Sequence, residues 1–203
     1  MTEDSTVEQA RADLAALKDL ANPLEVQLRT AAVIARVLGR TGDSVVVVGG
    51  SAVSFYTGGA YLSRDVDLVT TAPVGRIRDI LPRLGFERRN GAWVHAETDV
   101  VVDFPAPPLA GDPGRTTRVD TEEGSVHIIG IEDLLVDRLN AVVHWNDTEA
   151  REWCIAILAL HRDLDSAYLQ ARAETEGIAA ELREVSAEAA ALRGPKPPEH
   201  TGS

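Results

Sequence analysis

Residues 45–51 read Val45-Val46-Val47-Val48-Gly49-Gly50-Ser51, and this stretch decides the fold prediction. Four consecutive β-branched residues without a charge are typical of a short strand that is buried on both faces. Gly49 and Gly50 end this strand, and the residues from Ser51 to Tyr56 predict a short helix. The N–H groups of a glycine turn can approach an anion closely, and a helix N-terminus adds its positive dipole end. The stretch therefore predicts a phosphate-binding turn, in which Ser51 adds a hydroxyl group.

The form of this turn excludes two common nucleotide-binding motifs. A P-loop needs Gly-x-x-x-x-Gly-Lys-Ser/Thr, which does not occur in the chain. No Gly-x-Gly-x-x-Gly follows a predicted strand either, so the sequence disfavours a dinucleotide-binding domain.

Three aspartates further along the chain predict a metal site. Asp65 and Asp67 stand at the start of a predicted strand, where side chains two residues apart point to the same face. Two carboxylates held so close repel each other unless a cation or a shared proton lies between them, and carboxylate oxygens suit Mg²⁺. Asp103 stands near the C-terminal end of the predicted apolar strand 100–104, where an unpaired charge is costly. If the two strands are neighbours, the three carboxylates converge on one two-metal site.

Each of these features also has an ordinary structural interpretation. A single Asp-x-Asp occurs often by chance. Asp65 is also suited to a turn, and Asp103 is also suited to a position where the chain leaves the sheet for solvent. Gly49-Gly50 is equally suited to a plain strand-ending turn. The order of a buried strand, Gly-Gly-Ser, a short helix, Asp-x-Asp and a lone strand aspartate favours the metal site.

The remaining pattern predicts a sheet in the middle third of the chain, between helical ends. Residues 1–44 are predicted to form helices that pack on a core at 45–130, and Asn90-Gly91 predicts a hairpin within that core. From residue 131 the apolar residues recur at helical spacing. A stripe of apolar residues at heptad spacing predicts a helix over 164–192. Residues 131–193 are thus a C-terminal helical region, and 194–203 are predicted to be a disordered tail.

Charge and composition narrow the function classes. The net charge of −12 argues against a broad nucleic-acid-binding surface, and the acidic excess lies mainly after residue 130. The lone cysteine, Cys154, stands in an apolar run and is predicted to be a buried, inert thiol. No apolar run reaches membrane-spanning length and the N-terminus is acidic, so we expect a cytoplasmic protein without membrane contact.

The order of these motifs resembles the DNA polymerase beta-type nucleotidyltransferase superfamily. Within it, the chain is most similar to small bacterial members of abortive-infection and toxin–antitoxin systems. The stretches 129–139 and 162–169 are similar to the segments that follow the catalytic sheet in those proteins. The resemblance covers about residues 30–175. It implies an α+β fold, in which helices flank a nucleotidyltransferase-type mixed β-sheet and a C-terminal helical region follows.

The resemblance also implies an activity, the transfer of a nucleoside monophosphate from an NTP to an acceptor hydroxyl. Asp65 and Asp67 would hold two Mg²⁺ ions, and Asp103 would complete the site of the ion that activates the acceptor. The β- and γ-phosphates would be bound by the turn, and further phosphate or base contacts would come from two arginines. The residues implied to bind nucleotide are Gly49, Gly50, Ser51, Arg64 and Arg138. In related proteins lysine often stands at the position of Arg138.

Three other functions remain possible from the sequence. Asp-x-Asp also marks metal-dependent glycosyltransferases, although only 64 residues precede Asp65. Arg138 and His144 have the spacing of a ribonuclease motif, but the chain has too few helices for that domain. The strongest alternative is a non-catalytic protein of the same fold that binds a nucleotide or a partner protein.

The acceptor and the partners stay open at this point. An RNA end such as that of tRNA and a protein are both candidate acceptors, and the acidic C-terminal helices disfavour extended RNA. Five arginines of the middle segment form either a groove for an RNA end or a solvated face; they are Arg76, Arg78, Arg83, Arg88 and Arg89. The 164–192 helix is a candidate surface for a partner protein or for self-association.

Overall fold

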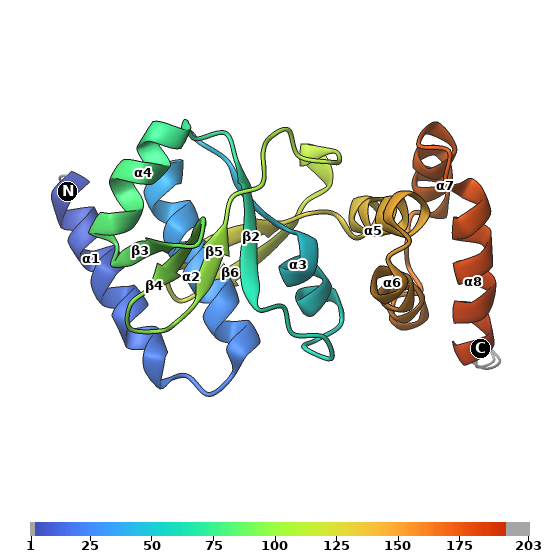
Figure 1. The fold of residues 1–203 in the computed structure, drawn as a ribbon, viewed down its shortest axis with the longest axis horizontal. Coiled ribbons are helices and arrows are strands. Elements are labelled where there is room, and N and C mark those ends of the chain that lie inside the picture. Colours follow the sequence, from blue (N-terminus) through green and yellow to red (C-terminus); the bar gives the residue numbers. More distant parts are fainter. Residues whose placement is uncertain (1–2, 194–203) are drawn as a thin grey trace, which may run out of the picture. The chain divides into compact units, whose positions relative to one another are not determined.

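The computed structural model describes residues 3–193, which fall into two compact units divided after Leu134. Each unit is described by itself. The first contains a mixed β-sheet with its helices, and the second is helical (Figure 1). The predicted tail, 194–203, lies outside the described residues.

The described part of the first unit contains one sheet of seven strands, in the order β3-β4-β5-β2-β1-β7-β6. The strands are β1 (Val45–Val48), β2 (Asp65–Thr70), β3 (Phe86–Arg89), β4 (Ala92–His95), β5 (Val101–Asp103), β6 (Thr117–Thr121) and β7 (Gly124–Ile128). Its helices are α1 (Glu3–Ala16), α2 (Pro23–Gly39), α3 (Gly49–Tyr56) and α4 (Val74–Arg83), with short 3-10 helices at Leu17–Asp19 and Pro113–Arg115. A further helix, α5 (Ile131–Trp145), begins in this unit and continues into the second.

The strand β1 is an internal strand of the sheet, and it is buried as its composition predicts. It runs antiparallel to β2 and parallel to β7, and all four of its valines are buried. On the other side of β2 lies β5, which runs parallel to it. A strand with neighbours on both sides and helices over the sheet has no polar surface to face, so uncharged β-branched residues suit it.

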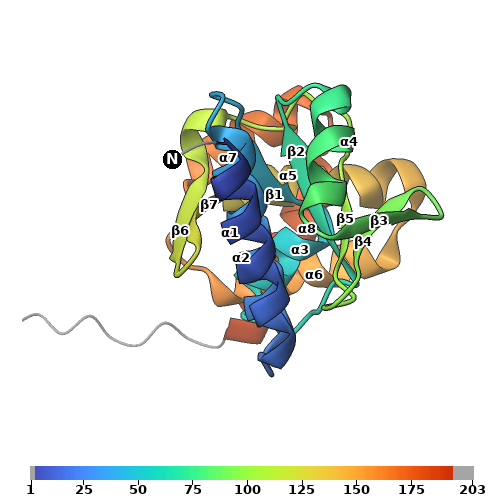
Figure 2. The same ribbon diagram turned by 90° about the vertical axis from the view of Figure 1, so that its left-hand side faces the viewer.

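The two helices before β1 pack as a layer beside the sheet. Pro23 is the first residue of α2, and the Asn22 side chain caps the helix by accepting a hydrogen bond from the Leu24 N–H at 3.1 Å. α2 packs on β1 and β7, and α1 packs on α2 and α4. Figure 2 shows α1 and α2 in front of the strands of this unit.

The predicted Asn90-Gly91 hairpin joins β3 to β4. Arg89 pairs with Ala92, which leaves a two-residue turn, and both turn residues have positive φ, 52° at Asn90 and 96° at Gly91. Positive φ at both positions is the requirement of a type I′ turn, which Asn-Gly meets at low cost. The hairpin forms one edge of the sheet.

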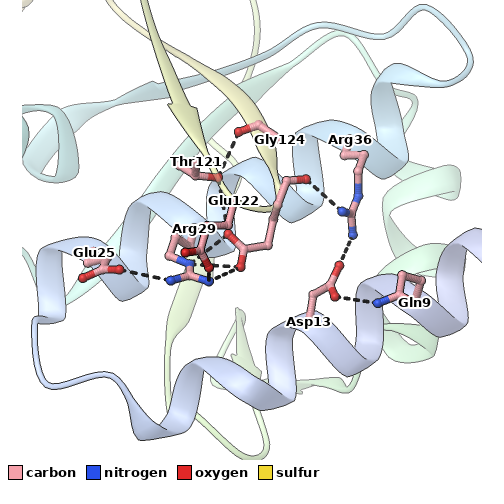
Figure 3. A network of polar contacts seen from close by, with 9 residues as sticks. Gln9, Asp13, Glu25, Arg29, Arg36, Thr121, Glu122 and Gly124 are labelled. Atoms are coloured by element: carbon pink, nitrogen blue, oxygen red, sulfur yellow. Dashed lines mark hydrogen bonds and ion pairs between the residues drawn. The ribbon is translucent and has the colours of Figure 1, made fainter.

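A polar network ties the β6–β7 turn to α1 and α2 (Figure 3). The Glu123 carboxylate is 7% exposed and accepts hydrogen bonds from the Arg29 guanidinium, with Nε 2.9 Å from each oxygen. The Glu123 hydrogen bond raises the pKa of the Arg29 guanidinium above its ordinary value. Arg36 donates from Nη1 to the Glu123 carbonyl oxygen at 2.8 Å and also bonds Asp13 of α1. The network therefore joins the β6–β7 turn to two helices that lie near the start of the chain.

Glu123→Gln is expected to lower the free energy of unfolding by about 2–3 kcal/mol, because it leaves the largely buried Arg29 charge without its main partner. The adjacent turn residue supplies a matched control. Glu122 also contacts Arg29, but its side chain is 81% exposed, so Glu122→Gln should cost less than about 0.5 kcal/mol. Urea denaturation followed by circular dichroism measures both, and equal effects would show that burial does not govern this ion pair.

The imidazole of His95 is buried at the end of β4. Its Nδ1 lies 3.0 Å from Thr98 Oγ1, and its ring packs edge-on against Phe86. Burial lowers the pKa of the His95 imidazole below its ordinary value, although a backbone hydrogen bond at Leu84 and the charge of Glu97 oppose this. The folded protein therefore holds a neutral His95 in conditions where the unfolded chain would bind a proton.

Acidification below about pH 6.5 is accordingly expected to destabilise the first unit through His95, since a lowered folded-state pKa makes protonation favour the unfolded chain. The contribution is fully present above pH 6.5 and is lost as the pH falls through the folded-state pKa. NMR titration of the His95 ring protons measures this pKa directly. A folded-state pKa at or above 6.5 would contradict the expectation.

The second unit is built from the rest of α5 and from α6 (Thr148–Leu160), α7 (Ser166–Thr175) and α8 (Ala179–Arg193). α8 packs against α6 and α7, and Arg151 of α6 forms ion pairs with Glu181 and Glu188 of α8. Cys154 is buried, and burial raises the pKa of its thiol to about 12. The predicted burial of this thiol is therefore confirmed, and a raised pKa disfavours the reactive thiolate.

The single helix predicted over 164–192 is wrong, because the chain forms two helices there. Gly177 has φ +74°, and α7 ends in a Schellman motif: the Ile178 N–H donates to the Ala173 carbonyl at 2.9 Å, and the Gly177 N–H to Glu174 at 3.2 Å. Three stripe residues of α8, Leu182, Val185 and Ala189, are buried within the unit, whereas Leu192 is 71% exposed. The buried residues stabilise the unit itself, and a partner protein or self-association through this region stays a prediction.

No helix in the described part of the chain combines the length and the apolar character needed to cross a membrane.

Candidate active site

The Gly-Gly turn lies between β1 and α3. α3 begins at Gly49, two residues earlier than predicted, and Gly49 has φ +58°. A Cβ atom at Gly49 would overlap with the Asp67 carboxylate, and one at Gly50 would lie 2.8 Å from Ser63 Oγ. Both positions therefore need glycine because polar side chains approach the turn closely.

Asp65 and Asp67 lie on β2 with alternating burial. Val66 and Leu68 are buried in the core, whereas the two aspartates are half-buried. The period of two places both carboxylates on one face of the sheet, next to the Gly-Gly turn. Val48, the residue before the turn, pairs with Asp67 across β1 and β2.

The register of β2 and β5 places the third aspartate beside this pair. Asp67 pairs with Asp103, and Asp65 pairs with Val101. Adjacent strands lie about 4.8 Å apart, and directly paired residues present their side chains to the same face. The three aspartates thus share one face at neighbouring positions. Val102 is buried on the other face.

Each of the three carboxylates accepts a hydrogen bond from a group close to it. The Gly50 N–H donates to Asp67 Oδ2 at 3.2 Å, the Ser63 hydroxyl to Asp65 Oδ1 at 3.0 Å, and the Phe104 N–H to Asp103 Oδ1 at 2.9 Å. Within residues 3–193, no group of three His, Cys, Asp or Glu side chains is close enough to form a ready-made metal cluster. The strands share a face, but the carboxylates are not gathered on one point, so the metal site stays a prediction.

The Ser51 hydroxyl has a structural role in this arrangement. Ser51 is buried, its Oγ donates to the Val48 carbonyl at 2.9 Å, and it accepts from the Asp67 N–H at 3.2 Å. These two bonds hold the start of α3 against β1 and β2. A phosphate contact from Ser51 stays a prediction.

The structure adds residues that sequence reasoning missed. Ser54 accepts from the Ser63 N–H at 2.9 Å and donates to the Gly50 carbonyl at 3.1 Å. Gln27 of α2 donates to the Ser63 carbonyl at 2.8 Å. Two contacts to its backbone, from Ser54 and Gln27, therefore fix Ser63 while its hydroxyl bonds Asp65. The only sequence signal is its position two residues before Asp65, and an exposed loop serine has the same appearance.

Tyr56 fixes the other end of α3. Its hydroxyl donates to the Ile129 carbonyl at 2.8 Å and lies 2.8 Å from Thr117 Oγ1. Burial raises the pKa of the Tyr56 hydroxyl to about 12, which keeps it protonated and unsuited to act as a base. α3 is thus held at both ends.

The two predicted nucleotide-binding arginines occupy different units. Arg64 is exposed and directly precedes Asp65 in the first unit. Arg138 belongs to the second unit, where its Nε and Nη2 bond Asp137 at 3.0 and 2.6 Å. Nucleotide contacts from both residues stay predictions.

Four of the five arginines of α4 and the hairpin contact neighbouring side chains, and Arg89 does so through Glu87 at 2.9 Å. Arg76 lies 3.7 Å from Asp43, Arg83 pairs with Asp4, and the Arg88 guanidinium lies 5.8 Å from the centre of the Trp93 ring. These contacts favour a solvated, locally paired face over a groove for an RNA end.

Comparisons with known proteins bear on the fold. No protein-family model matches the chain, and no sequence among curated proteins matches it. Among solved structures, the chain is similar to an antigenic nucleotidyltransferase-like protein from Paracoccidioides brasiliensis, with a TM-score of 0.57 and 15% sequence identity. The match covers 84% of this chain and 94% of the other. At this identity the likeness concerns the fold alone, and on that basis the chain has a nucleotidyltransferase-like fold.

Proposed function

We propose that this protein is a Mg²⁺-dependent nucleotidyltransferase, which moves a nucleoside monophosphate from an NTP to an acceptor hydroxyl and releases pyrophosphate. The observation that carries the proposal is the register of β2 and β5, which puts Asp65, Asp67 and Asp103 on one face beside the Gly49-Gly50 turn. Carboxylates and backbone N–H groups side by side are suited to a metal-bound triphosphate, since one set binds the cations and the other the phosphates.

The chemistry of the donor set fits Mg²⁺. All three side chains offer hard carboxylate oxygens, and the hydrogen bonds described above help to orient them. Asp65 and Asp67 would hold both ions, and Asp103 would join them at the ion nearer the acceptor. When bound, such ions neutralise phosphate charge and lower the pKa of the attacking hydroxyl.

The protein's own residues would position the substrate. Gly49 and Gly50 would present N–H groups to the β- and γ-phosphates, and Gly50 would exchange its present bond to Asp67 for one to a phosphate oxygen. Ser63, held by Ser54 and Gln27, would keep the Asp65 carboxylate in a fixed orientation. Catalysis would arise mainly from positioning and charge neutralisation.

The acceptor and the biological setting are also part of the proposal. We expect an RNA end, such as that of tRNA, or a protein hydroxyl as the acceptor, in the cytoplasm. The sequence resemblance favours a place in a toxin–antitoxin or abortive-infection system, with a partner protein encoded nearby. Arginines of α4 that are already paired with carboxylates are less available to bind phosphates, so we favour a short acceptor over extended RNA.

The test is incubation with Mg²⁺, a tRNA mixture or a candidate partner protein, and each NTP labelled at either the α- or the γ-phosphate. We expect label from the α-phosphate to become attached to the acceptor, and γ-label to be released as pyrophosphate. Attachment of γ-label alone would identify a kinase and overturn the proposal. Absence of transfer with every NTP and acceptor would count against catalysis.

A second candidate, nucleotide binding without turnover, is favoured by two observations. The Gly50 N–H is bonded to Asp67, and the described residues contain no ready-made three-ligand cluster. The same experiment separates the two functions. A non-catalytic protein would bind an NTP saturably in the presence of Mg²⁺, yet transfer neither label.

A further inference from the structure

A cavity of about 370 Å³ lies within the second unit, between the end of α6, the loop after it, α7 and α8. Its volume lies at the lower end of the range for small-molecule sites. Leucines of all three helices contribute apolar surface, including Leu158, Leu169 and Leu182. The polar groups that line it come from different elements: Arg162, Ser166, Gln170, Arg183, Ser186 and Arg193.

The charge of this pocket is opposite to that of the unit around it. Residues 135–193 contain six arginines and eleven aspartates or glutamates. Three of the arginines line the pocket, and no carboxylate side chain does. A concentration of one charge sign in a concave site raises the local potential and favours a ligand of the opposite sign.

The ion pairs of the unit sharpen this contrast. The other three arginines, Arg138, Arg151 and Arg172, all have carboxylate partners. Among the described residues, no carboxylate is within ion-pair distance of Arg162, Arg183 or Arg193. Three guanidinium groups around one cavity repel one another, and an anion between them would relieve this repulsion.

Backbone carbonyls hold two of these arginines at the pocket. Arg193 Nη2 donates to the His161 carbonyl at 3.1 Å, and Arg162 Nη2 donates to the Arg193 carbonyl at 3.4 Å. Arg193 Nε is buried and has no hydrogen-bond partner. These contacts keep the guanidinium groups in place without neutralising their charge. Arg183 has no partner among the described residues.

We propose that this pocket binds a small organic phosphate ester, with the phosphate on the three arginines and the apolar part against the leucines. Guanidinium groups match phosphate oxygens in charge and geometry, and the Ser166 and Ser186 hydroxyls add uncharged donors. The site lies wholly within the second unit, so it neither uses Asp65, Asp67 and Asp103 nor depends on the proposed transferase reaction.

The test is calorimetric titration of the full chain with AMP, inorganic phosphate and adenosine, in EDTA so that a metal-dependent nucleotide site does not contribute. AMP is expected to bind saturably and more tightly than inorganic phosphate or adenosine. Arg183→Gln and Arg162→Gln should each weaken AMP binding by about tenfold or more. Arg172→Gln is the matched control on α7. It removes an arginine that pairs with Glu176 and does not line the pocket, so affinity should stay within about twofold.

Four outcomes would overturn the proposal: no saturable binding of AMP, adenosine binding as tightly as AMP, inorganic phosphate binding as tightly as AMP, or both pocket variants binding like the unaltered chain. A fourth variant, Asp67→Asn, separates this site from the proposed active site. AMP binding in EDTA should be unchanged in Asp67→Asn, and its loss there would assign the binding to the first unit. Failure of the transferase assay leaves these expectations unaltered.

Discussion

Asp67→Asn is expected to lower the rate of label transfer by about a thousandfold, which corresponds to about 4 kcal/mol of transition-state stabilisation. Asparagine has nearly the same shape and retains an oxygen for the Gly50 N–H, so the turn should stay in place. What the variant removes is the charge at the centre of the predicted metal site, beside Asp103. The measurement is transfer of α-phosphate label at saturating NTP and Mg²⁺.

Asp79→Asn is the matched control for this variant. Asp79 is an exposed residue of α4, and its replacement makes the same chemical change away from the Gly-Gly turn. Transfer by Asp79→Asn should stay within about twofold of the unaltered chain. A second measurement does not depend on turnover: added Mg²⁺ should raise the melting temperature of the unaltered chain more than that of Asp67→Asn. Equal rates and equal Mg²⁺ responses in the two variants would refute a metal-binding role for Asp67.

Gly49→Ala is expected to lower the free energy of unfolding by about 2–3 kcal/mol and to reduce transfer strongly. Two costs combine at this position. A φ of +58° strains any residue with a Cβ, and the added methyl group would overlap with the Asp67 carboxylate. Relief of the overlap requires Asp67 to move away from Gly50 or β1 to shift against β2. Both movements disturb the proposed site, so we expect stability and activity to fall together.

Gly58→Ala separates these two costs. Gly58 has nearly the same φ, +60°, but a Cβ there would have no atom within 4 Å. This variant should therefore show backbone strain alone, about 1 kcal/mol, with transfer unchanged. Urea denaturation and the labelling assay, applied to both variants, measure the difference. If Gly49→Ala cost no more than Gly58→Ala, the close approach of Asp67 to the turn would be contradicted.

The parts of the fold that the sequence predicts well depend on neighbouring residues. Four valines followed by two glycines predict a buried strand and a turn, and Asn90-Gly91 predicts a hairpin, because β-branched side chains and positive φ restrict the backbone locally. The prediction of one long C-terminal helix was wrong for a related reason. Its apolar spacing continues through Gly177, but spacing does not reveal that Ile178 and Ala173 close a Schellman motif.

The candidate site divides in the same way. Alternation along a strand is enough to put Asp65 and Asp67 on one face, whereas Ser51 shows the limit of such reasoning. A serine after two glycines suggests a phosphate ligand, yet its hydroxyl is bonded to Val48 and to the Asp67 N–H. These two hydrogen bonds of Ser51 depend on how closely β2 approaches α3, and no local sequence pattern encodes that distance.

The sequence by itself therefore determined the local elements around the Gly49-Gly50 turn and the shared face of Asp65 and Asp67, since both follow from backbone preferences over a few residues. Only the tertiary structure decided that β5 lies beside β2 and brings Asp103 opposite Asp67. It also decided that Arg162, Arg183 and Arg193 line one pocket without carboxylate partners. These arrangements join residues tens of positions apart, and their register is set by the packing of whole strands and helices.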